Sequence, residues 1–250
     1  GKKLKIIGRA GAGVDNIDLV SAKKNNVIVM NTPGGNTNAT AEHTLSLLMS
    51  LYRSIPQANE GTHKGLWEKK KFKGMELKNK HVGIIGFGNV GVRFSEIALA
   101  LGMNVSVYSE SFASRKNDYP SINNLSLNSL ITQSDIISFH CKPTADGKPI
   151  LSLKEFKTMK KNSVIINTAR GNLINEKDLK EALENNIISG AALDVFSTEP
   201  AKNNILFGTK NIILTPHIAA STIEAQLVVA EQIALQISNY FNKKEIVNSL

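Results

Sequence analysis

The sequence predicts an α/β protein whose main part is a doubly wound parallel sheet. From residue 81 onward, short runs rich in Val and Ile recur every 20 to 30 residues. These runs show little alternation of polar and apolar residues, as strands buried on both faces require. The segments between them carry helical patterns, which is the arrangement of a sheet covered by helices. The predicted strands span residues 81–85, 105–108, 135–140, 164–168, 190–195 and 212–215.

A smaller α/β piece precedes this sheet. Its pattern predicts a strand over residues 4–7, a helix over 16–24 and a strand over 27–30. Three such short elements bury too little surface to form a core of their own. We therefore expect a domain that begins upstream of Gly1, with domain boundaries near residues 35 and 220.

Two longer helices complete the predicted elements. Leu45, Leu48 and Tyr52 share one helical face and predict a single helix over residues 40–58. A second long helical pattern covers residues 222–242, with apolar residues available for packing.

The composition excludes several classes of protein. The 250 residues are 42% hydrophobic and 20% charged, which predicts a folded chain and excludes a disordered one. No apolar run reaches the length of about 18 residues that a membrane-spanning helix needs, and no signal-peptide pattern follows the first residues. A single cysteine, Cys141, cannot form an internal disulfide, so we expect a cytoplasmic protein. We predict no metal site and no membrane partner.

The net charge of +9 has three interpretations: the chain binds nucleic acid, it binds small anions, or its lysine-rich surface has no binding role. The densest basic cluster is a group of seven lysines within residues 64–80, interleaved with Trp67 and Phe72. It matches no nucleic-acid-binding signature. We therefore predict no nucleic-acid partner, and the other two interpretations remain open.

A glycine-rich segment follows the predicted strand 81–85 and precedes a helix. Gly86, Gly88 and Gly91 form the pattern GxGxxG, which in this context predicts dinucleotide binding. Gly86 permits the tight turn, Gly88 leaves room for the pyrophosphate, and Gly91 lets the helix approach the strand. The pyrophosphate is then expected on the N-terminus of the helix.

The residues after the next strand leave the choice of cofactor open. An acidic residue about 20 positions after the glycine motif binds the ribose of NAD. Ser109 stands at that position and Glu110 follows it. Glu110 on the ribose favours NAD, whereas Ser109 with Arg115 on a 2′-phosphate favours NADP. We predict NAD, with NADP as the alternative.

Three polar residues follow the ends of three consecutive predicted strands. Arg170, Glu199 and His217 can converge because ligands of such sheets bind outside the carboxyl ends of the strands. An arginine matches a carboxylate with two parallel hydrogen bonds. A histidine can exchange a proton with a hydroxyl or carbonyl oxygen, and a neighbouring carboxylate orients it. The trio predicts hydride transfer at a 2-hydroxy or 2-keto acid.

These motifs resemble the D-2-hydroxyacid dehydrogenase family, and within it the branch that acts on 3-phosphoglycerate. The matching segments are residues 8–16, 31–37, 67–72, 167–171, 191–196 and 215–222. The resemblance implies a Rossmann-like NAD-binding domain over residues 36–220. It also implies that residues 1–35 are the C-terminal part of a flavodoxin-like substrate domain, to which residues 221–250 return as a helix.

The resemblance further implies oxidation of 3-phosphoglycerate to 3-phosphohydroxypyruvate, the first step of serine synthesis. Arg170 then binds the carboxylate, and His217 and Glu199 form the acid/base pair. Further substrate contacts come from Arg9, Gly11 and Asn36. The implied cofactor-binding residues, beside the three glycines, are Ala12, Asn89, Val90, Ser109, Cys141, Thr168, Ala169, Asp194, Ala219 and Ala220.

Two other functions remain open on the sequence. One is an NADPH-dependent glyoxylate or hydroxypyruvate reductase. The other is a non-catalytic NAD(H)-sensing scaffold that resembles the C-terminal-binding-protein corepressors. In addition, the helix over residues 40–58 and Trp67 favour a homodimer, with a homotetramer as the alternative.

Overall fold

The computed structural model describes residues 3–250 of the chain, which form two compact units. The sheet unit consists of Ala41–Ala219, and the terminal unit consists of the described residues up to Thr40 together with Ala220–Leu250. The first boundary, which the sequence placed near residue 35, lies at Thr40, inside helix α2 (Thr37–Tyr52). Each unit is described separately.

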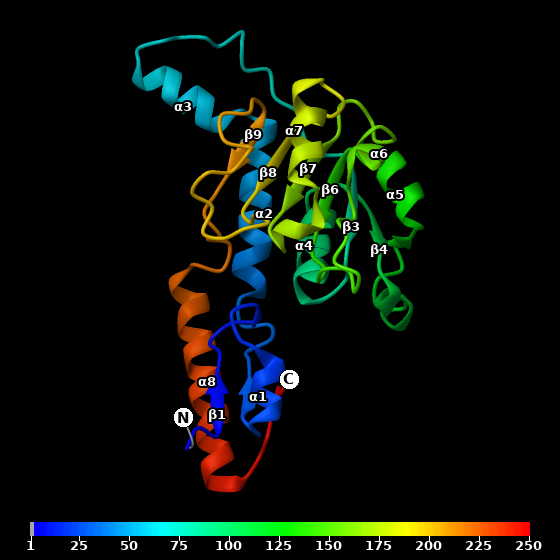
Figure 1. Ribbon diagram of the computed structural model, residues 1–250. Coiled ribbons are helices and arrows are strands. Elements are labelled where there is room, and N and C mark those ends of the chain that lie inside the picture. Colours follow the sequence, from blue (N-terminus) through cyan, green and yellow to red (C-terminus); the bar gives the residue numbers. More distant parts are fainter. Residues whose placement is uncertain (1–2) are drawn as a thin grey trace. The chain divides into compact units, whose positions relative to one another are not determined.

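The sheet unit contains a seven-stranded parallel sheet in the order β5-β4-β3-β6-β7-β8-β9 (Figure 1). The direction of the strand order reverses between β3 and β6, where open α/β sheets bind their ligands. The strands are β3 (His81–Ile85), β4 (Asn104–Tyr108), β5 (Asn123–Asn124), β6 (Ile136–Phe139), β7 (Val164–Asn167), β8 (Gly190–Leu193) and β9 (Ile212–Leu214). This confirms the predicted doubly wound α/β fold.

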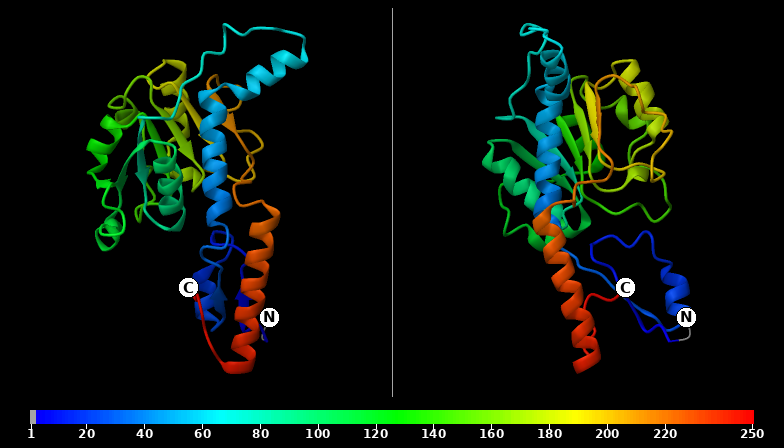
Figure 2. Two further views of the ribbon diagram at one scale, coloured as in Figure 1. Left: turned by 180° about the vertical axis from the view of Figure 1, so that it is seen from behind. Right: turned by 90° about the vertical axis from the view of Figure 1, so that its left-hand side faces the viewer.

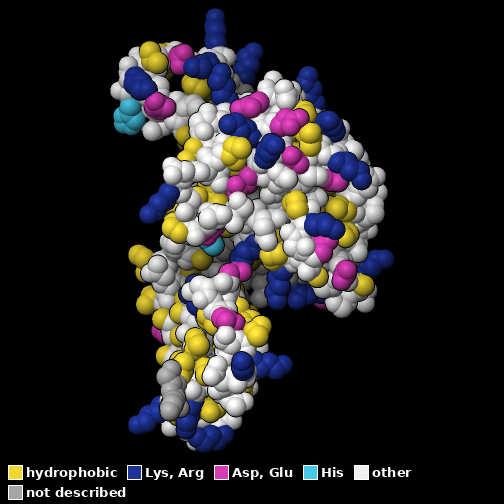
Figure 3. Space-filling model, in the orientation of Figure 1, with side chains coloured by type: hydrophobic (Ala, Val, Ile, Leu, Met, Phe, Trp, Pro, Cys, Tyr) yellow, Lys and Arg dark blue, Asp and Glu magenta, His cyan; other side chains and the backbone are white. Residues whose placement is uncertain are grey.

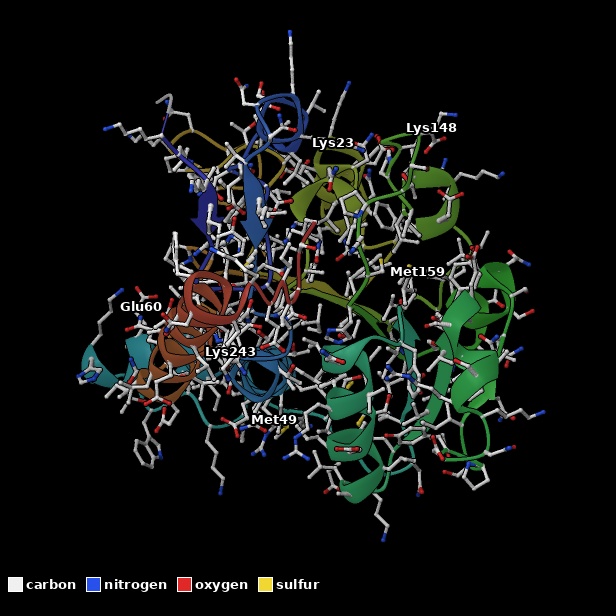
Figure 4. All side chains as sticks on the ribbon, turned by 90° about the horizontal axis from the view of Figure 1, so that it is seen from below. Lys23, Met49, Glu60, Lys148, Met159 and Lys243 are labelled. Atoms are coloured by element: carbon white, nitrogen blue, oxygen red, sulfur yellow. The ribbon has the colours of Figure 1, made fainter. Side chains whose placement is uncertain are left out.

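Helices cover both faces of this sheet (Figures 1 and 2). One face packs against residues 41–52 of α2 and against α4 (Asn89–Ala100), through a cluster that includes Leu48 and Phe94. The other face packs against α5 (Leu127–Gln133), α6 (Leu153–Phe156) and α7 (Glu176–Glu184). Met159, labelled in Figure 4, belongs to this second cluster. Two short 3₁₀ turns, η1 (Glu110–Arg115) and η2 (Gly171–Leu173), follow β4 and β7. The apolar strands are therefore buried on both sides.

The prediction of one helix over residues 40–58 is wrong. The chain forms two helices, α2 and α3 (Ile55–His63), separated at Ser54, which has a left-handed φ of 49°. Pro56 has no N–H to continue α2, and the Tyr52 carbonyl accepts a hydrogen bond from Met75 N–H instead. No side chain of α3 is buried.

The segment after α3 carries much of the basic charge. Figure 3 shows Lys and Arg side chains gathered over it. Glu60, labelled in Figure 4, pairs with Lys64 at the end of α3, and Glu68 pairs with Lys71. The side chain of Trp67 is 87% exposed.

The terminal unit is a parallel strand pair with two helices. Strand β1 (Ile6–Gly8) pairs with β2 (Ile28–Met30), and α1 (Leu19–Lys24) connects them. Helix α8 (Ile223–Lys243) begins after Thr222, whose hydroxyl accepts a hydrogen bond from Ala225 N–H. Gly8 lets this helix approach β1 closely, because a Cβ there would lie 2.6 Å from Ile237 Cδ1. Within residues 3–250, no helix is long and apolar enough to cross a membrane.

Candidate active site

The glycine-rich turn connects β3 to α4 at the point where the strand order reverses. Gly86 has a φ of 97°, and a Cβ there would lie 2.6 Å from the His140 carbonyl oxygen. A Cβ on Gly91 would lie 2.2 Å from the Gly86 carbonyl oxygen. A Cβ on Gly88, in contrast, would meet no atom within 4 Å. Packing of the turn therefore requires glycine at positions 86 and 91, whereas open space surrounds position 88.

This turn fits a dinucleotide. Helix α4 begins after Gly88, and no side chain caps its N-terminus. The backbone N–H groups of the first turn, including those of Asn89 and Val90, are then available to an anion, and the helix dipole favours negative charge there. The open space at Gly88 gives a phosphate access to this backbone. These features match the predicted roles of Gly86, Gly88, Asn89, Val90 and Gly91, which remain proposals.

Cys141 follows β6 beside the same turn and is half-buried. Burial raises the pKa of its thiol to about 11, so the thiol stays protonated at neutral pH. Cys141 is thus suited to packing against a ligand rather than to nucleophilic chemistry.

Ser109 follows β4 and is held by Asn124 of the short strand β5. Ser109 N–H donates to Asn124 Oδ1, and Asn124 Nδ2 donates to the Ser109 carbonyl, both at 3.2 Å. The hydroxyls of Ser109 and Ser111 lie 3.0 Å apart, and Glu110 between them is exposed. The end of β4 therefore presents hydroxyl groups, with one acidic side chain beside them.

Arg170 lies in a turn that directly follows β7. Asn167 is fully buried and holds this turn from both ends: its Oδ1 accepts from Ala169 N–H, and its Nδ2 donates to the Arg170 carbonyl. Arg170 Nη1 donates to the Ala169 carbonyl at 2.7 Å. A Cβ on Gly171 would lie 1.8 Å from the backbone carbon of Phe196, so the loops after β7 and β8 touch backbone to backbone.

Glu199 and His217 form a hydrogen-bonded pair. His217 Nδ1 lies 2.6 Å from Glu199 Oε2, and Glu199 Oε1 accepts from Phe196 N–H at 3.0 Å. An ionised carboxylate only accepts hydrogen bonds, so Nδ1 carries a proton and Nε2 remains for another partner. The side chains of His217 and Glu199 are 47% and 34% exposed. His217 also has a left-handed φ of 54°, an unusual backbone conformation for a residue with a side chain.

Asp194, predicted to bind the cofactor, also holds the His217 loop through its side chain. Its side chain is fully buried, and its oxygens accept hydrogen bonds from the Thr215 hydroxyl at 2.6 Å, from Ile218 N–H at 2.9 Å and from Ala219 N–H at 2.8 Å. Burial raises the pKa of Asp194, but these hydrogen bonds and one from His43 lower it more, so the net shift is downward. An ionised Asp194 thus holds the chain on both sides of His217.

The predicted site residues of the terminal unit lie in two loops that bind each other. Gly11 N–H donates to the Thr32 hydroxyl at 2.7 Å, and Asn31 Nδ2 donates to the Ala12 carbonyl at 2.7 Å. Arg9 is exposed and donates to the Ala10 carbonyl. Asn36 is half-buried just before α2, and its carbonyl accepts from Thr40 N–H. The sheet unit holds the other predicted residues except Ala220, which is the first residue of the returning segment.

Residues 45–219 match the family described as D-isomer specific 2-hydroxyacid dehydrogenase, NAD binding domain. The chain belongs to this family. The match covers most of the sheet unit, which therefore corresponds to the NAD-binding domain of this family. Among residues 3–250 no group of three His, Cys, Asp or Glu side chains is placed to hold a metal ion.

Several relatives of this chain carry more specific names. D-3-phosphoglycerate dehydrogenase of Archaeoglobus fulgidus is 41% identical over 95% of this chain and 45% of its own, and that of Bacillus subtilis is 40% identical over 99% and 47%. The chain therefore spans about half the length of these relatives. Hydroxypyruvate reductase of Thermotoga maritima is 40% identical over 95% of this chain and 78% of its own.

Solved structures agree with the fold of this chain. An acyclic imino acid reductase in complex with NADPH and D-Arg is 35% identical, with a TM-score of 0.90 over 99% of this chain and 79% of that chain. A glyoxylate reductase from Paecilomyes thermophila is 30% identical, with a TM-score of 0.90 over 100% and 76%.

The sequence prediction missed four residues of the site. Asn167 and Thr215 fix the turns that carry Arg170 and His217, and His43 and Thr44 reach the same turns from α2. Asn167 directly precedes the predicted Thr168, and Thr215 lies two residues before the predicted His217. A polar residue at a strand end beside a predicted site residue is therefore a usable signal. His43 and Thr44 carry no such signal, because α2 is remote in sequence from the strands that it contacts.

Proposed function

We propose that this dehydrogenase transfers a hydride between NAD and C2 of a 2-hydroxy acid, with 3-phosphoglycerate and 3-phosphohydroxypyruvate as the substrate pair. The observation that carries the proposal is the His217–Glu199 pair at the carboxyl edge of the sheet that also carries the glycine-rich turn. The reaction moves a proton and a hydride at the same substrate carbon–oxygen bond. It therefore needs a proton-exchanging histidine on the same edge of the sheet as the cofactor that transfers the hydride.

The side chains have distinct roles in this proposal. Arg170 binds the substrate carboxylate through its guanidinium group and thereby fixes which face of C2 is presented. In the oxidation, His217 Nε2 takes the hydroxyl proton while C2 loses its hydride, and the product is the 2-keto acid. In the reduction, Nε2 returns the proton to the carbonyl oxygen. Glu199 holds Nδ1 and stabilises the positive charge on the ring. When bound, the nicotinamide accepts or supplies the hydride.

A phosphorylated substrate is supported by three observations. The relatives named D-3-phosphoglycerate dehydrogenase are 41% and 40% identical over nearly the whole chain. The resemblance implies that Arg9 and Asn36 contact the substrate phosphate, and the side chain of Arg9 is exposed. The lysines that follow α3 provide further positive charge. The proposed reaction is then the first step of serine synthesis.

A second candidate is an NADPH-dependent hydroxypyruvate or glyoxylate reductase. It is favoured by Ser109 at the end of β4, where an acidic residue would select NAD. The hydroxypyruvate reductase of Thermotoga maritima, 40% identical over 78% of its own length, also supports it.

One absorbance assay of reduced nicotinamide separates the candidates. The full-length protein is offered 3-phosphoglycerate with NAD or NADP, and phosphohydroxypyruvate, hydroxypyruvate or glyoxylate with NADH or NADPH. Turnover of the phosphorylated pair alone supports the first proposal, and faster turnover of hydroxypyruvate or glyoxylate with NADPH supports the second. No turnover despite cofactor binding would instead favour the non-catalytic NAD(H)-sensing scaffold.

We also propose that the protein is a homo-oligomer. Trp67 is 87% exposed and α3 buries no side chain, as expected of surfaces that pack against another copy. Light scattering of the protein as it elutes from a size-exclusion column measures its mass, and the mass of a monomer would refute this proposal.

A further inference from the structure

Two consecutive polar residues of α2, His43 and Thr44, contact the turns that carry two of the three proposed active-site residues, Arg170 and His217. His43 Nε2 lies 3.2 Å from the Thr215 hydroxyl and 3.4 Å from Asp194 Oδ1. The hydroxyls of Thr44 and Thr168 lie 2.9 Å apart. All five residues belong to the sheet unit.

These contacts have a regular relation to the site. Thr168 is the first residue after β7 and lies two positions before Arg170. Thr215 is the first residue after β9 and lies two positions before His217. One turn of α2 thus contacts the first residue after β7 and the first residue after β9, each two positions before a proposed active-site side chain.

A polar side chain on a buried helix face often forms a hydrogen bond within its own helix. The hydroxyl of Ser95 on α4 shows it: it donates to the Gly91 carbonyl one turn earlier in the same helix. His43 and Thr44 have hydrogen-bond partners 172 and 124 positions away in the chain. These hydrogen bonds connect different elements, and each lies at a turn with a proposed role in the reaction.

The His43 contact acts on the loop around His217. The Thr215 hydroxyl donates to Asp194 at 2.6 Å, so its oxygen accepts from His43 Nε2–H. Asp194 in turn accepts from the N–H groups of Ile218 and Ala219. His43 therefore supports the acceptor that fixes the backbone on both sides of His217.

The Thr44 contact acts on the turn around Arg170. Thr44 is fully buried and Thr168 is 7% exposed, so the two hydroxyls meet away from water. A hydrogen bond in such surroundings is costly to lose, because a buried hydroxyl is left without its partner. It fixes Thr168 and, two residues later, the start of the Arg170 side chain.

We propose that His43 and Thr44 are positioning residues: His43 holds the proton-transferring His217, and Thr44 holds the carboxylate-binding Arg170. The proposal rests on the proposed function for the roles of His217 and Arg170. It assigns separable effects to two neighbouring residues of one helix.

Amide hydrogen exchange tests the His43 arm without substrate or cofactor. In His43→Leu we expect the N–H groups of Ile218 and Ala219 to exchange about fivefold faster than in the parent, the factor that one hydrogen bond typically contributes. His43→Gln, whose amide can replace the Nε2 donor, is expected to restore slow exchange. Ser46→Ala is the matched control, because Ser46 lies on the same helix and its hydroxyl donates only one turn back, to the Glu42 carbonyl. Parent-like exchange in His43→Leu would overturn this arm.

Should His43→Leu not fold, Thr215→Val tests the same link, because it removes the hydroxyl between His43 and Asp194 at nearly constant volume. It is expected to raise the exchange of the same two N–H groups, and unchanged exchange would overturn the His43 arm.

Steady-state kinetics test the separation of the two roles. We expect His43→Leu to lower kcat about tenfold with KM for the hydroxy acid nearly unchanged, because it misplaces the proton acceptor. Thr44→Val should raise KM about tenfold with kcat nearly unchanged, because it misplaces the carboxylate-binding arginine. His43→Gln should recover most of kcat. Equal effects of His43→Leu and Thr44→Val on kcat and KM would show a purely structural role.

The two experiments also separate this proposal from the proposed function. If the parent turns over none of the hydroxy acids, the proposed function fails, and the exchange rates alone decide whether His43 holds the His217 loop.

Discussion

Replacing Gly88 by alanine distinguishes a turn built for a ligand from one built for the fold. A Cβ at position 88 would meet no protein atom within 4 Å, and the φ of −80° suits any residue. Alanine at this position lowers the conformational entropy of the unfolded chain, which stabilises the fold, but it is a poorer N-cap of α4 than glycine. Because these two small effects nearly cancel, the free energy of unfolding should change by less than about 1 kcal/mol. In the proposed placement of the pyrophosphate on this turn, the same Cβ would occupy space that the pyrophosphate needs. We expect the Kd for NADH to rise about tenfold or more, equivalent to about 1.4 kcal/mol.

Gly91→Ala is the matched control for this prediction. Its Cβ would lie 2.2 Å from the Gly86 carbonyl oxygen, so the backbone of the turn must move. We expect a loss of about 2 kcal/mol in the free energy of unfolding, within the range of overpacked sites. Urea unfolding measures the stability of both variants, and isothermal titration calorimetry measures their NADH affinity. Parent-like NADH affinity in Gly88→Ala would refute the placement of the pyrophosphate on this turn.

Further predictions concern the remaining parts of the site. Arg170→Ala should mainly raise KM for the hydroxy acid, whereas His217→Ala should lower kcat by about a hundredfold or more, because it removes the general base. Steady-state kinetics in both directions measure these effects. A change confined to cofactor affinity would contradict the two roles. Asp194→Asn should destabilise the protein by about 2 kcal/mol at neutral pH, because a buried carboxylate with several donors is lost. Since the folded-state pKa of Asp194 is lowered, its contribution is complete above the unfolded-state value and is lost as the pH falls through the folded-state value. Urea unfolding should therefore show a smaller difference between Asp194→Asn and the parent below about pH 4, and a constant difference would count against an ionised Asp194. Ser109→Asp should increase the preference for NADH over NADPH about tenfold, measured as the ratio of kcat/KM values, because a carboxylate binds the ribose diol and repels a 2′-phosphate.

The parallel sheet and its glycine-rich turn were predictable because their signals are local. Buried parallel strands require continuous apolar runs, and the turn requires glycines at fixed spacing. Strand β5 escaped prediction because Asn123 and Asn124 are polar and join the sheet only by pairing with β4. The break between α2 and α3 was overlooked although Pro56 marks it, since the apolar positions suggest a continuous helix on both sides.

The candidate site was predictable in its charged residues and not in the contacts that hold them. A charged side chain after an apolar strand is visible in the sequence, whereas the partners of Asp194 are fixed only when β8 and β9 pair. Asp194 illustrates the difference. Its place within a family motif implies contact with the cofactor, which remains a proposal. Its burial and its hydrogen bonds to the loop of His217 are visible only in the folded structure.

The close approach of Gly171 to Phe196 limits how this site can change during evolution or design. Loops at the edge of a parallel sheet usually diversify one at a time, because each touches mainly its own strand and helix. Here the loops of Arg170 and Glu199 meet through backbone atoms, with no side chain between them to be trimmed or enlarged. A new substrate specificity built into the arginine loop therefore requires a compensating change in the glutamate loop. In chimeras between relatives, the two loops should therefore be exchanged together.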